Sequence, residues 1–307
     1  MTSGIGFTHA AICSRSLLYA VAVVDELDAA NVRHAVLWKR TEAWQSWTVK
    51  NRIIAICKLD PVTGQVLFVG NDGNMLRYEG DSFQPEAIGV PEKGPSALRT
   101  LTAAQVIGKY VYAAGMQRQV FRRPLAGGNW SRCDQTCLED GKPFRMAGFL
   151  AIQGFHEEDL YATGYHGEIW HFDGKRWTSL DSPTNVRITS ICCVEPGVVY
   201  LSGDHGLLLK GNNTDGWEVI GDGSYPHTFW SMEYFAGVLY LSSNHGKLFQ
   251  LEDQAIVPVD FKLKHEVSTF TLTQGDGLLL SIGNHDLLLL DGETWSPIPL
   301  PKPPVKE

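Results

Sequence analysis

Short apolar runs that end in a turn recur along the chain at a nearly constant spacing. Four of them align directly, at residues 160–167 (LYATGYHG), 199–206 (VYLSGDHG), 239–246 (LYLSSNHG) and 279–286 (LLSIGNHD). Their histidines are 39, 40 and 40 residues apart, and two earlier runs, 66–73 (VLFVGNDG) and 111–117 (VYAAGMQ), fit the same pattern. A repeat of this length is typical of arrays of small supersecondary units.

Each run is one strand in a set of four. A turn follows it, then a further strand such as 168–172 (EIWHF), then a second turn and usually a tryptophan, as at Trp177, Trp217 and Trp295. One more strand, such as 187–192 (RITSIC), precedes the run. Four short strands joined by Gly- and Asp-rich turns are the composition of a β-propeller blade. In such a blade we expect the repeated tryptophan to pack between neighbouring blades.

The chain holds seven such units. It is therefore predicted to be one soluble, all-β domain over residues 1–307, a seven-bladed β-propeller of four-stranded blades. The blades are placed at residues 6–50, 51–90, 97–135, 143–182, 185–222, 227–262 and 266–300. The first blade departs most from the repeat, because it carries an insertion around residues 25–33 that contains the only candidate helix.

The Asp-Gly turn followed by tryptophan resembles the repeat of the Asp-box propellers. That superfamily includes the sialidase-like repeat proteins and propellers of the photosystem assembly-factor type. The nearest match to the full motif is 290–295 (LDGETW), and no copy is complete. The resemblance implies a propeller fold and no particular reaction, because one fold can carry unrelated functions.

Composition excludes several kinds of partner. The formal net charge is -8, and a protein that grips nucleic acid in general usually has a basic excess. The first residues lack the basic and apolar regions of a signal peptide, and no apolar stretch reaches the length of a membrane span. We therefore expect a cytoplasmic protein with no membrane contact and no general nucleic-acid binding.

The six cysteines indicate reduced, buried thiols rather than disulfides or a metal site. Most of them lie in apolar strand-like runs, and the adjacent pair Cys192 and Cys193 points to opposite faces of one strand. Cys133 and Cys137 form a C-x3-C pair, but no second pair of ligands stands at zinc spacing. No metal or other cofactor is predicted.

Four arginines open the first strands of four consecutive blades. They are Arg52, Arg99, Arg145 and Arg187, at steps of 47, 46 and 42 residues. The corresponding positions of the other blades fall near Thr8 or His9, Phe229 or Trp230, and Ser268. First strands line the central channel of a propeller, so the four guanidinium groups should ring half of one channel mouth, facing a half that is aromatic and polar.

Two interpretations of this arginine cluster stay open. Guanidinium groups bind carboxylates and phosphates in a bidentate manner, so the mouth is a candidate site for an anion or an acidic partner. Alternatively, the arginines pair within the fold, either with backbone carbonyls or with acids of the preceding loops, namely Glu92, Glu139, Asp140 and Asp181.

The repeated histidines, His166, His205, His245 and His285, lie in the turns between second and third strands. These turns belong to the same mouth as the arginines, so the histidines are candidate contact residues. Equally, they can be turn residues that hydrogen-bond neighbouring blades. Turns on adjacent blades should be more than roughly 10 Å apart, too far for a shared metal with bonds of ~2 Å.

Two classes of function remain. The first is a non-catalytic, protein-binding propeller, monomeric by itself, that acts as an assembly chaperone or as an immunity protein blocking a toxin. An acidic protein suits a basic toxin, because opposite charges speed association. The second is an enzyme acting at the arginine-lined mouth, either a sialidase-like hydrolase, which the resemblance ties to six blades and a Tyr–Glu pair, or a lyase using a His and a Glu. No catalytic residues can be assigned from the sequence.

Overall fold

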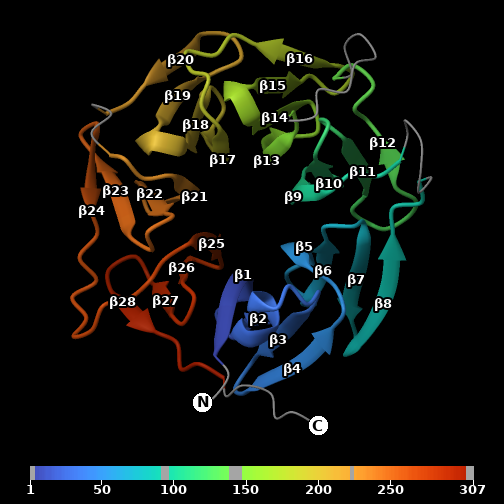
Figure 1. The fold of residues 1–307 in the computed structure, drawn as a ribbon, viewed down its shortest axis with the longest axis vertical. Coiled ribbons are helices and arrows are strands. Elements are labelled where there is room, and N and C mark those ends of the chain that lie inside the picture. Colours follow the sequence, from blue (N-terminus) through green and yellow to red (C-terminus); the bar gives the residue numbers. More distant parts are fainter. Residues whose placement is uncertain (1–3, 91–96, 138–146, 222–224, 302–307) are drawn as a thin grey trace.

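Seven four-stranded antiparallel sheets form a ring in the computed structural model, which describes residues 4–90, 97–137, 147–221 and 225–301 (Figure 1). In every sheet the spatial order of the strands follows the chain, from the innermost first strand to the outermost fourth. The predicted seven-bladed, all-β propeller is thus confirmed.

The strands of the first four blades have the following bounds. They are β1 (Ile5–Ser14), β2 (Leu17–Val24), β3 (Ala35–Arg40), β4 (Trp44–Val49); β5 (Ile53–Asp60), β6 (Gln65–Gly70), β7 (Asn74–Glu79), β8 (Ser82–Ala87); β9 (Leu101–Ile107), β10 (Tyr110–Gly115), β11 (Val120–Pro124), β12 (Ser131–Arg132); β13 (Phe149–His156), β14 (Asp159–Gly164), β15 (Ile169–Phe172) and β16 (Trp177–Leu180).

The last three blades complete the ring. Their strands are β17 (Ile188–Glu195), β18 (Val198–Gly203), β19 (Leu208–Asn212), β20 (Gly216–Val219); β21 (Phe229–Phe235), β22 (Val238–Ser243), β23 (Leu248–Glu252), β24 (Ala255–Pro258); β25 (Thr271–Gly275), β26 (Leu278–Ile282), β27 (Leu287–Leu290) and β28 (Trp295–Pro297). The helical elements in the described ranges are α1 (Asp25–Ala29), inside the insertion of the first blade, and the 3-10 turns η2 (Tyr165–Gly167) and η3 (Asp204–Gly206).

The hydrophobic core is divided among the interfaces between neighbouring blades. Trp177 of β16 is buried against the preceding blade, where its indole nitrogen donates to the Cys133 carbonyl at 2.9 Å. Trp217 and Trp295 pack in the same way against the fourth and sixth blades. The repeated tryptophan therefore joins blades, because its outer strand leaves one face free to meet the preceding sheet.

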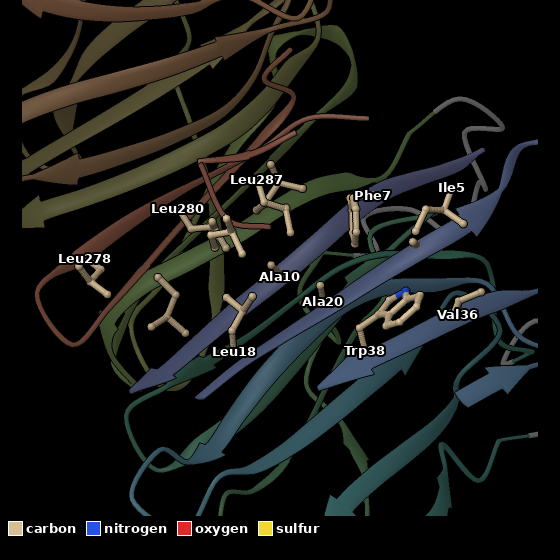
Figure 2. Close-up of a cluster of buried hydrophobic side chains, with 14 residues drawn as sticks. Ile5, Phe7, Ala10, Leu18, Ala20, Val36, Trp38, Leu278, Leu280 and Leu287 are labelled. Carbon is tan, nitrogen blue, oxygen red and sulfur yellow. The ribbon is translucent and has the colours of Figure 1, made fainter. Parts of the chain in front are cut away.

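Among the described residues, no strand is exchanged between the two ends of the chain to close the ring, since each blade is continuous in sequence. Closure depends on contacts between the first and seventh blades. Thr271 donates its hydroxyl to the Thr8 carbonyl at 3.1 Å, and the Phe7 amide donates to the Asn284 carbonyl at 2.9 Å. Ile5, Phe7 and Trp38 share one buried apolar cluster with Leu280 and Leu287 (Figure 2).

The disc has two different ends. At one, which we call the mouth end, lie the turns between second and third strands and the connections between blades. At the other, the far end, lie the turns between first and second and between third and fourth strands. Within the described ranges, no helix has the length and apolar character needed to cross a membrane.

All six cysteines have free thiols, and five are buried. Burial raises the pKa of the Cys57, Cys133 and Cys192 thiols to about 12, so these thiols are protonated and unreactive at neutral pH. Cys133 and Cys137 lie in the interface between the third and fourth blades. Among the described residues, no group of three or more potential ligands is arranged to hold a metal ion.

Candidate functional site

The innermost strands enclose a central channel with a cavity of about 650 Å³. Residues from all seven blades line it, among them Ala10, Ile54, Thr102, Leu150, Ser190 and Thr271. Most of these side chains are small or apolar, so the channel wall itself offers few groups for chemistry.

The described arginines lie at the mouth end of this channel. Arg52 and Arg187 directly precede β5 and β17, and Arg99 lies two residues before β9. Arg145 lies outside the described residues, as do three of the acids considered as partners, Glu92, Glu139 and Asp140.

Neither Arg52 nor Arg99 forms an ion pair with a described carboxylate. The Arg52 side chain is exposed and makes no hydrogen bond or ion pair with the described part of the chain. Arg99 is half-buried, and its Nε donates to Oε1 of Gln117 at 2.9 Å. These two guanidinium groups are available to an incoming group.

Arg187 is held by an acid of the fold. Its Nε and Nη2 donate to the two carboxylate oxygens of Asp204 at 3.1 and 2.9 Å. Although burial acts in the opposite direction, the hydrogen bonds from Arg187 and Thr228 lower the pKa of the Asp204 carboxyl. The partner of Arg187 is therefore Asp204 of η3, rather than Asp181 of the preceding loop.

Trp230 lies beside this ion pair. Its indole is 44% exposed, and the Arg187 guanidinium carbon lies 5.5 Å from the ring centroid, in cation–π range. Because Phe229 pairs with Ser243 as Ile188 pairs with Gly203, the residue that matches Arg187 in the sixth blade is Thr228. Trp230 stands two positions further along the strand.

The four repeated histidines are exposed at the mouth end, one on each of four blades. His166 and His205 adopt a left-handed backbone with φ of 57°. Nδ1 of His285 lies 2.9 Å from the Ile5 carbonyl across the ring closure, and the His245 ring lies 4.3 Å from that of His227. These contacts are consistent with a structural role for the histidines in the turns and between blades. All four rings are nevertheless exposed at the mouth end, where a partner can reach them.

The sequence analysis did not identify two acids that the structure places at the ends of the channel, Asp204 and Glu233. Asp204 is the only acid at its position of the repeat, where the other aligned turns have Asn71, Met116, Tyr165, Asn244 and Asn284. An acid that appears in only one of the aligned turns could have been identified from the sequence as a candidate partner for an arginine. Glu233 gave none, because it lies in an ordinary strand pattern, yet it faces the far end of the channel.

Glu233 forms a small polar network at that far end. Burial raises the pKa of its carboxyl to about 7, although Nε2 of Gln274 donates to it at 2.8 Å. Nζ of Lys58 donates to the Gln274 carbonyl at 2.9 Å. The network links the second, sixth and seventh blades.

Solved structures with the same fold differ widely in sequence. The chain aligns with the WD40 propeller domain of Doa1 (TM-score 0.68, 10% identity, 94% of this chain and 93% of that one). It also aligns with YCF48 bound to D1 peptide (0.67, 13%, 94% and 92%) and with a Staphylococcus aureus virginiamycin B lyase in complex with quinupristin (0.71, 9%, 94% and 94%). Identities this low establish the fold alone.

One sequence relative is much closer. No family model matches the chain. Over 294 residues, however, it is 32% identical to the immune protein Tsi7 of Pseudomonas aeruginosa, covering 92% of this chain and 94% of that protein. Similarity of this extent spans the whole propeller. The chain therefore belongs to the same family as the immune protein Tsi7.

Proposed function

We propose that this protein is an immunity protein that neutralises a toxin by binding it through the mouth end of the propeller. The observation that carries the proposal is the similarity to the immune protein Tsi7 along nearly the full chain. Binding without chemistry suffices for such a role, because a rigid propeller can cover the working surface of another protein.

The mouth end supplies suitable contact groups. It presents the exposed guanidinium of Arg52, the half-exposed Arg99 and the Arg187–Trp230 pair. Arginine and tryptophan are among the residues that most often dominate the binding energy of protein interfaces. The four repeated histidines lie at the same end. The proposed contact surface comprises these histidines, the groups just named and Arg145, which is assigned to it from the sequence repeat alone.

The far end is the other surface through which a toxin could bind, and it is acidic where the mouth end presents arginines. Its turns hold ten acids, namely Glu42, Asp81, Glu157, Glu158, Asp173, Asp215, Asp253, Asp276, Asp291 and Glu293, against four bases, Arg15, Lys109, Lys175 and Arg176. Together with the net charge of -8, these acids favour a basic toxin and speed its encounter with the protein. The far end is therefore the alternative contact surface for a basic toxin, and experiment must distinguish it from the mouth end.

The remaining features of the proposal are a cytoplasmic, monomeric protein that needs no cofactor. The enzyme alternative has less support. The sialidase-like version needs six blades, and the structure has seven.

The test is to recover the toxin and show that this chain neutralises it. The tagged chain, purified under native conditions from the organism that encodes it, should bring down one protein in equal amount, identified by mass spectrometry. Expression of that protein alone should arrest growth, and co-expression of the chain should restore it. Absence of a stoichiometric partner, or a partner without toxicity, would contradict the proposal.

A further inference from the structure

The geometry points to Trp230 as the anchor of the contact, with its open indole face receiving an apolar side chain of the toxin. This inference rests on the proposed function and names the residue and the chemistry through which the mouth binds. It differs from recognition of an acidic group by the arginines.

The repeat provides an internal comparison for Trp230. In six blades the pairing between first and second strands skips one residue near the mouth, and the skipped residues are Thr8, Ile54, Thr102, Leu150, Thr189 and Trp230. Five of these side chains are half-buried, and only Trp230 is exposed. The sixth blade thus has a large aromatic side chain in solvent where its counterparts are partly covered.

The threonines at this position hold the ring together. The hydroxyls of Thr102 and Thr189 donate to carbonyls of their own second strands at 3.3 and 3.2 Å. Each also lies in hydrogen-bond contact with the carbonyl that opens the next blade, Phe149 and Phe229 respectively. A tryptophan cannot make these bonds.

Other residues of the sixth blade perform that task. Ser242 donates its hydroxyl to the Phe270 carbonyl of the next blade at 2.7 Å, and the Leu272 amide donates to Oγ of Ser231 at 3.1 Å. Trp230 is therefore not needed to join the sixth and seventh blades. Tryptophan is among the residue types that most often dominate the binding energy of protein interfaces, so an exposed one beside the channel mouth is suited to this role.

The ion pair beside Trp230 decides what the indole binds. Asp204 accepts both hydrogen bonds from Arg187 and a third from the Thr228 hydroxyl at 2.8 Å, so the Arg187 charge is already compensated. Arg187 covers one side of the indole and leaves the other side open, and because Asp204 neutralises this cation, the pair offers no net charge to an incoming group. An apolar or aromatic side chain fits that open face best.

The experiment measures the affinity of the captured, identified and repurified toxin for variants of the full chain. Trp230→Ala should weaken binding about 30-fold or more, which corresponds to a hot-spot residue. Trp230→Phe, which keeps an apolar ring, should stay within about fivefold of the original protein. Because Trp230 is outside the core, the melting temperature of both variants should be unchanged.

Tyr234→Ala is the matched control, since Tyr234 lies on the same strand, is 36% exposed and faces the far end. It should bind normally. The ratio of affinities between the original protein and Trp230→Ala should also stay constant from about 0.05 M to about 0.3 M NaCl, because salt screens charges and not apolar contacts.

Each contrary outcome has a distinct meaning. Normal binding by Trp230→Ala, with loss in Arg52→Ala or Arg99→Ala, overturns the anchor and leaves the proposed function intact. Loss in Tyr234→Ala places the contact at the far end and also overturns the inference. A chain that captures no toxin at all overturns the proposed function and this inference with it.

Discussion

The two ends of the channel each combine an acid with a base, and the two arrangements respond to pH in opposite ways. At the mouth, Arg187 and Asp204 form two hydrogen bonds, and these lower the pKa of the acid despite burial. At the far end, burial dominates and raises the pKa of Glu233, while Lys58 bonds to a carbonyl instead. Direct pairing of an acid with a base, rather than mere proximity, therefore sets the sign of the shift.

The largest effect is expected at the far end. The carboxyl of Glu233 has a pKa of about 7 in the fold, above its ordinary value of 4.5, so the folded protein binds the extra proton between these values. The free energy of unfolding should then fall as pH rises from about 5 to about 7. Glu233→Gln should remove this dependence.

The size of the change follows from the shift. The difference between the folded and ordinary pKa values of Glu233 corresponds to a change of at most about 3 kcal/mol in the free energy of unfolding. Residual exposure of Glu233 to the channel should reduce this change to about 1–2 kcal/mol at pH 8. Urea unfolding at pH 5 and pH 8 measures it, with the exposed Glu195→Gln as control. Equal slopes for Glu233→Gln and the original protein would show that Glu233 is ionised normally.

The mouth should show the opposite dependence. Because the folded pKa of Asp204 is lowered, its contribution is present at neutral pH and is lost as pH falls through the acid range. Asp204→Asn should lower the free energy of unfolding by about 1 kcal/mol at pH 7, since the pair is partly exposed. Chemical unfolding at pH 7 and about pH 3 should show the difference shrinking in acid.

Asp181→Asn is the control for this prediction, because Asp181 is exposed in the loop before Arg187. Its stability should match the original protein within about 0.5 kcal/mol. If Asp181→Asn is the more damaging change, Asp181 and not Asp204 supports the arginine.

A smaller effect on the melting temperature should distinguish Arg187 from Arg52, which occupy equivalent positions of the repeat. Arg187→Ala removes the ion pair and should lower the melting temperature by a few degrees, about 2–4 °C per kcal/mol for a chain of this size. Arg52→Ala should leave it unchanged, since the Arg52 side chain has no described partner. Calorimetry of both variants decides this, and an equal loss would show that both arginines are structural.

The smallest effect tests why the two arginines differ. The Asn71 amide donates to the Arg52 carbonyl at 3.0 Å, as the Asp204 amide does to that of Arg187, so Asn71 stands where Asp204 stands. Arg33 also donates to Oδ1 of Asn71 at 3.0 Å, so Asn71→Asp should place an acid between Arg52 and Arg33 and add less than about 1 kcal/mol. An unchanged melting temperature, with no pKa shift of the new carboxyl by NMR, would contradict this equivalence.

The fold was predictable because the same pattern of strands and turns recurs in successive blades. Most positive-φ positions in the turns hold Gly, Asn or Asp, although His166 and His205 also adopt this conformation. The repeated tryptophans Trp177, Trp217 and Trp295 pack on the preceding blade. Where one copy of the repeat departs from the pattern, the other copies still indicate where its strands and turns lie. How the ring closes was not predictable, since it depends on contacts such as Thr271 to Thr8 that no local pattern records.

The site was only partly predictable. Arg52 and Arg187 precede their strands as the alignment indicates. In the sixth blade the residue that matches Arg187 is Thr228, one or two positions before the Phe229 or Trp230 that the sequence alignment placed there. The acid that holds Arg187 comes from the turn after the next strand, so proximity in sequence favoured Asp181 instead. The role of Arg145 stays a prediction.

Hydrogen–deuterium exchange on the chain with and without its captured toxin tests the central claim most directly, because it shows which end of the disc is covered. Binding through the mouth should protect residues 165–167, 204–206 and 227–231, the segments around Arg187 and Trp230. Protection confined to the acidic far-end turns, such as 157–158, 253–254 and 291–293, would contradict the account.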